Sequence, residues 1–152
     1  MKVVDFLKEG RIELNLEAFS KKDAIRKVAL LIEDDKAVLD FETLFKDILE
    51  REELKTTGIG DQIAIPHART DAVKHLVIAI GIFPRGVEFE ALDGKLVNLV
   101  FLMGTPKEKN LNNYLQLLAN LNRLLQKKSF RESLLDAKSS REIIEKFKEV
   151  EG

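Results

Sequence analysis

The amino-acid sequence predicts an α/β fold in which a small mixed β-sheet is sandwiched between helices. Two runs of strand length, 77–83 and 97–103, are almost continuously apolar and contain many β-branched and aromatic residues. Such runs are typical of strands that are covered on both faces. Segments with helical spacing of apolar residues lie before, between and after the predicted strands, and this order favours a layered α/β arrangement.

The N-terminal third predicts one strand followed by two helices. Residues 11–16 alternate between apolar and polar with a period of two, which indicates a half-exposed strand. Ser20 followed by Asp23 is close to a capping box, and the apolar residues after it share one helical face. Asp40 is the predicted cap of a second helix, which should end near Leu54. The apolar residues of the two helices are Ala24, Ile25, Val28, Ala29 and Ile32 in the first, and Phe41, Leu44, Phe45, Ile48 and Leu49 in the second.

The C-terminal third is predicted to be helical. A strong apolar stripe marks a long helix, a shorter helix is expected around 130–135, and a last helix begins at a cap formed by Ser139 with Glu142 three residues later. The stripe consists of Leu111, Tyr114, Leu115, Leu118, Leu121 and Leu125. Neither an internal repeat nor a low-complexity segment interrupts the chain, so residues 1–152 are predicted to form a single domain.

The composition excludes several classes of function. The 152 residues are 45% hydrophobic with a net charge of −1, so the chain lacks the basic surplus expected of a nucleic-acid-binding domain. It has no cysteine, which excludes disulfides, thiolate metal sites and cysteine nucleophiles. It also lacks an apolar run of about 18 residues and a signal-peptide core. We therefore expect a soluble, cytoplasmic protein.

The most informative segment is 56–69, where a histidine directly follows a proline at the end of a short apolar run. Residues 63–65 are predicted to form a short buried strand, and Pro66 should stop its hydrogen-bond ladder. His67 is therefore expected at a rigid strand end. Gly58 and Gly60 lie shortly before this strand, where glycine can adopt positive φ and leave backbone N–H groups open to a ligand.

This arrangement favours phosphoryl transfer. A neutral imidazole is a good nucleophile near pH 7, and the loose transition state of phosphoryl transfer requires positioning and cations. Arg51 is the leading candidate for the cation, since a guanidinium can bind two phosphoryl oxygens at once. Asp61 is a candidate to accept a hydrogen bond from the non-reacting ring nitrogen of His67. The hydroxyl groups of Thr56 and Thr57 are candidate donors to the phosphoryl group.

Together these motifs resemble the fructose/mannitol-type enzyme IIA domain of the bacterial phosphoenolpyruvate-dependent sugar phosphotransferase system, which includes nitrogen-type regulatory relatives. The resemblance rests on 51–52, 57–60 and 63–67, and it extends over the whole chain through 83–87, 93–94 and the leucine-rich helix. It implies that His67 is phosphorylated by a histidine phosphocarrier protein and passes the group to an enzyme IIB domain in sugar uptake. Arg51 and Asp61 would then support the reaction, which needs no metal and no organic cofactor.

Tyr114 departs from the pattern of the sugar-transporting members, which commonly have a second active-site histidine at this place. A tyrosine can donate a hydrogen bond, but its pKa near 10 prevents it from supplying a positive charge. The phosphoryl group would then depend more on Arg51 and on Arg69. The substitution also favours the alternative function, a nitrogen-type regulatory module in which phosphorylation of His67 controls binding to partner proteins.

Structural interpretations compete with these assignments. His67 could be a merely structural histidine, Arg51 a surface residue at a helix end, and Asp61 an ordinary turn residue. A metal site formed by His67 and His75 lacks a third ligand at standard spacing. An apolar rim for partner docking is expected around His67, with Ile59, Phe89, Leu111 and Leu115 as possible contributors.

Overall fold

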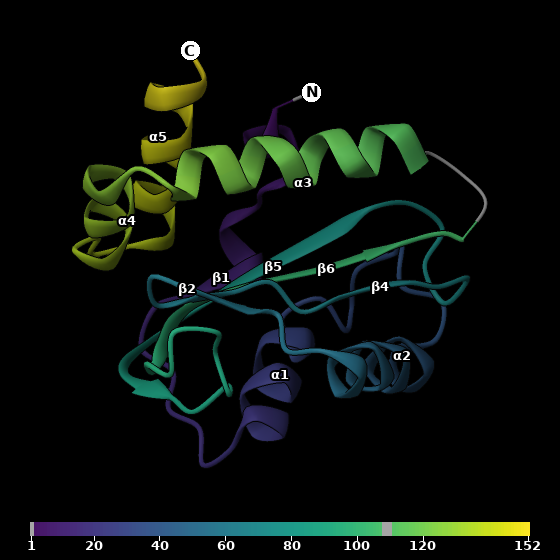
Figure 1. Ribbon diagram of the computed structural model, residues 1–152. Helices are drawn as coiled ribbons and strands as arrows, with labels where there is room; N and C mark the ends of the chain where they lie inside the picture. The colour runs from purple at the N-terminus through teal and green to yellow at the C-terminus, as the bar shows by residue number, and fades with distance from the viewer. Residues whose placement is uncertain (1, 108–110) are drawn as a thin grey trace.

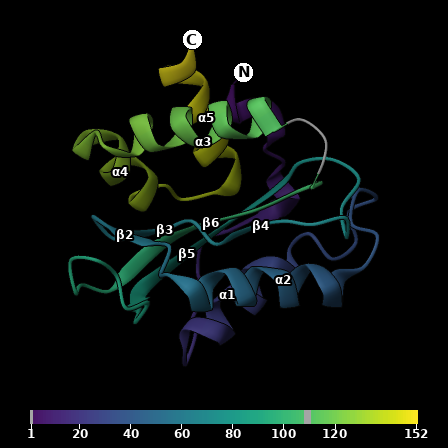
Figure 2. The ribbon, with the colours of Figure 1, turned by 45° about the vertical axis from the view of Figure 1, so that its right-hand side comes forward.

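The computed structural model describes residues 2–107 and 111–152, in which a six-stranded mixed sheet lies between two layers of helices (Figure 1). One layer consists of α1 (Lys21–Leu30) and α2 (Phe41–Leu54), and the other of α3 (Leu111–Leu125), α4 (Lys128–Leu135) and α5 (Ser140–Glu151). Figure 2 shows the same layers after a turn of the molecule. The predicted α/β sandwich is confirmed.

The sheet is built around two long antiparallel strands, β5 (Val77–Val87) and β6 (Val97–Thr105). The short strands are β1 (Ile12–Glu13), β2 (Gly58–Gly60), β3 (Ile63–Ala64) and β4 (His67–Arg69). The strand order is β1-β5-β6-β3-β2, and β4 pairs with β6 beyond the end of β3. Because β3 and β4 both run parallel to β6, the segment between them follows one edge of this central strand.

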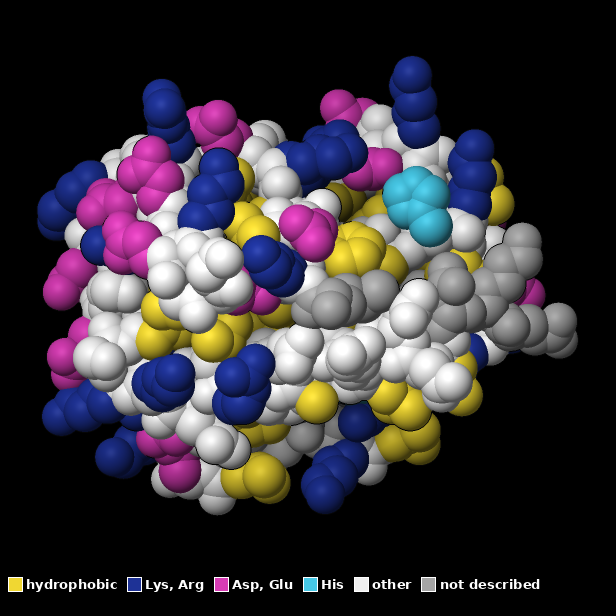
Figure 3. Space-filling model, turned by 90° about the horizontal axis from the view of Figure 1, so that it is seen from above, with side chains coloured by type: hydrophobic (Ala, Val, Ile, Leu, Met, Phe, Trp, Pro, Cys, Tyr) yellow, Lys and Arg dark blue, Asp and Glu magenta, His cyan; other side chains and the backbone are white. Residues whose placement is uncertain are grey.

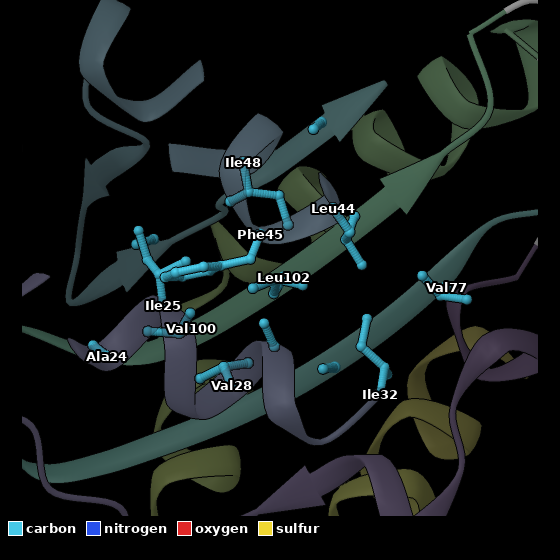
Figure 4. Close-up of a cluster of buried hydrophobic side chains, with 14 of the residues drawn as sticks. Ala24, Ile25, Val28, Ile32, Leu44, Phe45, Ile48, Val77, Val100 and Leu102 are labelled. Carbon is cyan, nitrogen blue, oxygen red and sulfur yellow. The ribbon is translucent and has the colours of Figure 1, made fainter. Parts of the chain in front are cut away.

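Alternating side chains of β6 contribute to two separate hydrophobic cores. Val100 and Leu102 pack with the apolar faces of α1 and α2, as Figure 4 shows. Phe101 and Met103 point to the other layer, where they pack with residues of α3 and α5 such as Leu117 and Phe147. A strand covered on both faces carries apolar residues at successive positions, which explains the continuous run in the sequence.

Three helices begin at the side-chain caps that the sequence predicts. Ser20 Oγ accepts a hydrogen bond from the backbone N–H of Asp23 at 3.1 Å, and Asp40 Oδ1 accepts one from Thr43 at 3.1 Å. Ser139 Oγ caps α5 in the same way. These caps satisfy N–H groups that have no partner within the helix. No helix in the described part of the chain has the length and apolar content needed to cross a membrane.

The strands differ in length from the prediction. The predicted strand over 11–16 is reduced to β1, because Arg11 ends a 3-10 turn (Glu9–Arg11) and the chain bends after Glu13. The strand predicted over 77–83 extends to Val87 across an irregular stretch. There the Asn98 side-chain amide donates to the carbonyl oxygens of Phe83 and Pro84, at 2.8 and 3.2 Å, and so ties the two strands together.

Candidate functional site

His67 is the first residue of β4 and lies opposite Met103 of β6. The carbonyl oxygen of Pro66 accepts a hydrogen bond from the backbone N–H of Met103 at 3.0 Å, which fixes the start of this strand. The sequence predicts that His67 ends a strand, whereas the structure shows that it begins one. Since Pro66 lacks an N–H group, the ladder is interrupted there and resumes at His67.

The ring of half-buried His67 is held through its Nδ1 atom. This nitrogen lies 2.7 Å from the carbonyl oxygen of Ile65. Because a carbonyl oxygen can only accept a hydrogen bond, Nδ1 must carry the proton in the neutral ring. Nε2 is then left with its lone pair and makes no hydrogen bond to any of the described residues.

The surroundings of His67 favour the neutral, nucleophilic form. Burial lowers the pKa of His67 below its ordinary value of 6.5, and the positive charge of Arg51 acts in the same direction. The hydrogen bond to the Ile65 carbonyl and the negative charge of Glu52 oppose this shift. The net direction is downward, so the ring is mainly neutral at pH 7.

His67 lines an open cavity of about 630 Å³ between the end of α2, strand β4 and the start of α3. The other lining residues are Asp47, Glu50, Arg51, Leu54, Ala68, Arg69, Lys107 and Tyr114. Three of them are cationic. The cavity therefore combines a nucleophilic ring nitrogen with positive charge, as the reception of an anionic phosphoryl group requires.

Arg51 and Arg69 enter this cavity from different elements. Arg51 lies in the last turn of α2, where its guanidinium donates to the carbonyl oxygen of Lys55 at 2.9 Å. Arg69 lies in β4, two residues after His67, and donates to the carbonyl oxygens of Pro106 and Lys107. Within residues 2–107 and 111–152 neither arginine forms a salt bridge. Both guanidinium groups therefore retain donors for an anion.

Tyr114, in the first turn of α3, lines the cavity and has a buried hydroxyl group. Its ring centroid lies 6.2 Å from that of His67, and its side chain is only 4% exposed. The hydroxyl group has no hydrogen-bond partner among the described residues. Burial raises the pKa of Tyr114 to about 12, so the group remains a protonated donor at neutral pH. A buried donor without a partner, on a ring next to that of His67, is a candidate to bind an incoming oxygen.

Asp61 does not lie in this cavity, which corrects its predicted role. It occupies the turn between β2 and β3, where its carboxylate faces Arg131 at 3.8 Å and its backbone N–H donates to Asp93. The sequence predicts that the Asp61 carboxylate accepts a hydrogen bond from the His67 ring, but the carbonyl oxygen of Ile65 accepts it instead. A carboxylate after glycine is common in turns, and Asp61 follows that pattern with φ of 55°.

Thr57, Gly58 and Gly60 also lie outside the cavity lining, although the sequence predicts that they bind the phosphoryl group. The Thr57 hydroxyl donates to Glu52 at 2.6 Å. A Cβ atom at Gly58 would come within 2.9 Å of the Ala91 backbone, so glycine is required there by close packing of two chain segments. Gly60 has φ of 103° and is the last residue of β2, just before the turn to β3.

None of the four residues predicted to form an apolar rim lines the cavity, although one other exposed leucine does. Leu54 is 83% exposed and lines the cavity, and Leu111 and Leu115 are exposed on α3. Figure 3 views the molecule from above Figure 1, and on this face hydrophobic side chains form small separate patches among charged side chains and white atoms. The expectation for Phe89 is wrong, because it is fully buried in the core beneath the sheet. Ile59 is exposed on β2, outside the cavity lining.

Sequence reasoning counted Glu52 in the motif of the family but gave no role to this residue, which is a buried carboxylate next to Arg51. Its oxygens accept hydrogen bonds from the backbone and the hydroxyl group of Thr57, and Lys21 lies 2.8 Å away. A signal was present in the sequence. Glu52 stands four residues after Ile48 and continues the apolar stripe of α2, where a charged residue is unexpected.

His75 is exposed and its Nδ1 atom lies 3.1 Å from the carbonyl oxygen of Leu76. It is not among the residues that line the cavity of His67. The described residues contain no cluster of three histidine, aspartate or glutamate side chains that would hold a metal ion.

Comparisons with known proteins identify the family of this chain. The family model for "Phosphoenolpyruvate-dependent sugar phosphotransferase system, EIIA 2" matches residues 5–150. The chain is 36% identical over 121 residues to the fructose-specific EIIABC component of Bacillus subtilis (strain 168), with 80% of this chain and 19% of that protein covered. It is 32% identical to a nitrogen regulatory protein of Pseudomonas aeruginosa, with 80% of this chain and 78% of that protein covered. The chain thus spans less than a fifth of the EIIABC protein and most of the nitrogen regulatory protein.

Solved structures show the same likeness. The nitrogen regulatory protein IIA-Ntr from Neisseria meningitidis superposes with a TM-score of 0.88 at 33% identity, covering 95% of this chain and 98% of that one. Enzyme IIA of mannitol, in a complex with phosphorylated enzyme IIB from Escherichia coli, gives a TM-score of 0.80 at 25% identity, covering 94% of this chain and 97% of that one. This chain belongs to the EIIA 2 family of the sugar phosphotransferase system.

Proposed function

We propose that this EIIA 2 family member is a phosphoryl carrier that accepts a phosphoryl group on Nε2 of His67 and passes it to a second protein. The observation that carries the proposal is the arrangement of the ring. Nδ1 is bound to the Ile65 carbonyl at 2.7 Å, while the ring borders a cavity with the guanidinium groups of Arg51 and Arg69.

In the loading step, the lone pair of Nε2 attacks the phosphorus of a phosphohistidine on a histidine phosphocarrier protein. The nitrogen–phosphorus bond of the donor breaks, and its electron pair returns to the donor imidazole. The proton on Nδ1 of His67 remains bound to the Ile65 carbonyl throughout. Arg51 and Arg69 bind the equatorial oxygens, where charge is spread in the transition state. The Tyr114 hydroxyl donates a further hydrogen bond without adding charge.

In the unloading step, an acceptor nucleophile takes the phosphoryl group and the bond to Nε2 breaks. We assign the acceptor to an enzyme IIB domain, for which two observations give support. The mannitol enzyme IIA with a similar fold was solved with phosphorylated enzyme IIB. Leu54 is an exposed apolar side chain at the cavity, and Leu111 and Leu115 are further exposed apolar side chains on α3 that a partner protein could cover.

A regulatory function is the second candidate, and Tyr114 together with the likeness to nitrogen regulatory proteins favours it. Phosphorylation would add a charge of about −1.5 to −2 at the cavity, close to the exposed Leu54. The charge would change the affinity of this surface for a partner protein. Both functions require that His67 be phosphorylated, and they differ in whether the group is passed on.

The first test is transfer of labelled phosphate from phosphoenolpyruvate through enzyme I and the phosphocarrier protein. We expect acid-labile label on the wild-type chain and on His75→Ala, the matched control at the other histidine, and none on His67→Ala. Absence of label on the wild-type chain contradicts the proposed function. Addition of a cysteine-bearing enzyme IIB domain then distinguishes the candidates, since loss of label to that domain supports transport and retention supports regulation.

A further inference from the structure

A buried network is formed near His67 by residues that do not line its cavity. Its centre is Glu52, which is 5% exposed although it is a glutamate. Glu52 Oε2 accepts from the backbone N–H of Thr57 at 2.7 Å, and Oε1 accepts from the Thr57 hydroxyl at 2.6 Å. Lys21 Nζ lies 2.8 Å from Oε2 and balances the charge. The carboxylate thus binds both the backbone N–H and the hydroxyl group of Thr57.

From Thr57 the network continues through the backbone to the histidine. The Thr57 carbonyl accepts a hydrogen bond from the backbone N–H of Ile65 at 3.1 Å. The carbonyl oxygen of the same Ile65 is the group that binds Nδ1 of His67 at 2.7 Å. Three hydrogen-bonded steps therefore connect the carboxylate of Glu52 to the ring, and each step fixes the position of the next group.

We propose that Glu52 is a positioning residue for His67, which holds the Ile65 carbonyl in place through Thr57 and thereby fixes the ring with Nδ1–H inward and Nε2 toward the cavity. The expected effect of Glu52 on the rate of phosphoryl transfer rests on the proposed function of His67. The orientation of the ring is a separate property of the unphosphorylated protein, so the two can be tested apart.

The position of Glu52 in α2 adds a second reason. Arg51 and Glu52 are neighbours in the last turn of one helix. Arg51 points to the cavity and Glu52 to the network, so this turn determines both the place of the cation and the place of the ring. A displacement of about 1 Å in such a pair can slow a reaction by two orders of magnitude.

A solely structural role would not require this connection. If the only role of Glu52 were its ion pair with Lys21, it would serve to connect α2 to α1. A well-packed apolar pair often stabilises such a helix contact equally well. The two hydrogen bonds to Thr57 are the feature that an apolar pair cannot replace. They link the carboxylate to the strand segment before His67, while the helix packing needs no such link.

The experiment compares Glu52→Ala, Glu52→Gln and Thr57→Val with the control Glu53→Ala. Glu53 is the next residue of the same helix and is exposed, so its loss removes an equal charge without touching the network. In Glu52→Gln the amide can still accept from the Thr57 N–H and donate to the Thr57 oxygen, so it preserves the geometry without the charge. Thr57→Val removes only the hydroxyl bond.

The first measurement is the tautomer of His67 from the ¹⁵N shifts of its ring, recorded at pH 8 on unphosphorylated protein. We expect wild type, Glu52→Gln and Glu53→Ala to show protonated Nδ1, and Glu52→Ala and Thr57→Val to shift measurably toward protonated Nε2. The second is the single-turnover rate of phosphorylation, where Glu52→Ala should be about tenfold slower or more, with Glu52→Gln within about threefold of wild type.

Unchanged ring shifts in Glu52→Ala, or in Thr57→Val if Glu52→Ala does not fold, would overturn the positioning role. An equal loss of rate in Glu52→Gln and Glu52→Ala would also overturn it, because the charge and not the geometry would then matter. Failure of the wild-type chain to take up phosphate refutes the proposed function alone, since the ring shifts still decide whether Glu52 positions His67.

Discussion

The two nitrogens of His67 lie in contrasting surroundings. On the inner side, formed by Lys21, Glu52, Thr57 and Ile65, the carboxylate is satisfied by short hydrogen bonds and an ion pair. On the cavity side, formed by Arg51, Arg69 and Tyr114, a buried hydroxyl group has no partner within the described residues. Satisfied buried groups hold a side chain rigidly, and unsatisfied ones favour binding of a ligand. Under the proposed function, one side would fix the ring and the other would receive the phosphoryl group.

The largest effect is expected from Arg51→Ala on the cavity side. Loss of a guanidinium that stabilises the transition state should slow phosphorylation of His67 by roughly 10²–10³-fold. Single-turnover transfer from the phosphorylated carrier protein measures the change. Arg85→Ala is the control, since Arg85 is exposed and lies in β5 away from the cavity. A wild-type rate in Arg51→Ala would show that the cation of the site is a different residue.

Lys21→Met should affect stability rather than chemistry, because it lies on the inner side. It leaves the carboxylate of Glu52 buried without its cation, which is expected to cost about 3 kcal/mol of the free energy of unfolding. For a chain of this size the melting temperature should fall by roughly 6–12 °C. Thermal unfolding followed by circular dichroism measures this, with Lys22→Met at the next, exposed position as control. Equal melting temperatures for the two variants would mean that Glu52 does not depend on Lys21.

Tyr114→Phe should separate ligand binding from stability. The lost hydroxyl group has no partner in the described structure, so the melting temperature should stay the same or rise slightly. Phosphorylation should slow by about tenfold, which corresponds to one hydrogen bond to a charged group. A variant that melts earlier and reacts at the wild-type rate would assign Tyr114 to the core instead of the site.

The smallest effect concerns the pKa of His67. Since burial and Arg51 lower this pKa, the NMR titration midpoint of His67 should lie below 6.5, and Arg51→Ala should move it upward. The folded protein then binds fewer protons than the unfolded chain. Its contribution to stability is present above pH 6.5 and is lost as the pH falls through the lower, folded pKa. A titration midpoint above 6.5 would contradict the claim that burial and Arg51 lower the pKa of His67.

The fold could be predicted from local patterns in the sequence, whereas the site could be predicted only in part. The long runs of β5 and β6 and the caps at Ser20 and Asp40 are visible in the sequence, because burial on both faces and capping leave local signatures. The cavity brings together His67, Arg51, Arg69 and Tyr114, whereas Asp61, which the resemblance implied as a supporting residue, lies outside its lining. The single-domain assignment and the cytoplasmic location remain predictions.

The errors concern partners that are distant in the chain or formed by the backbone. Asp61 was paired with His67 because a carboxylate often orients a histidine, but a backbone carbonyl two residues before the histidine serves instead. Backbone acceptors leave no trace in the sequence. Glu52 was given no role because glutamates on helices usually face solvent, and its partner Lys21 lies 31 positions away, in another helix.

The most direct test of the contrast between the two sides of His67 is the site of phosphorylation on its ring. We would phosphorylate ¹⁵N-labelled protein and read the coupling of phosphorus to the ring nitrogens by NMR. The structure predicts phosphorus on Nε2, with the proton still on Nδ1 and bound to the Ile65 carbonyl. Phosphorus on Nδ1 would contradict the account, because the inner side would then have to open for the reaction.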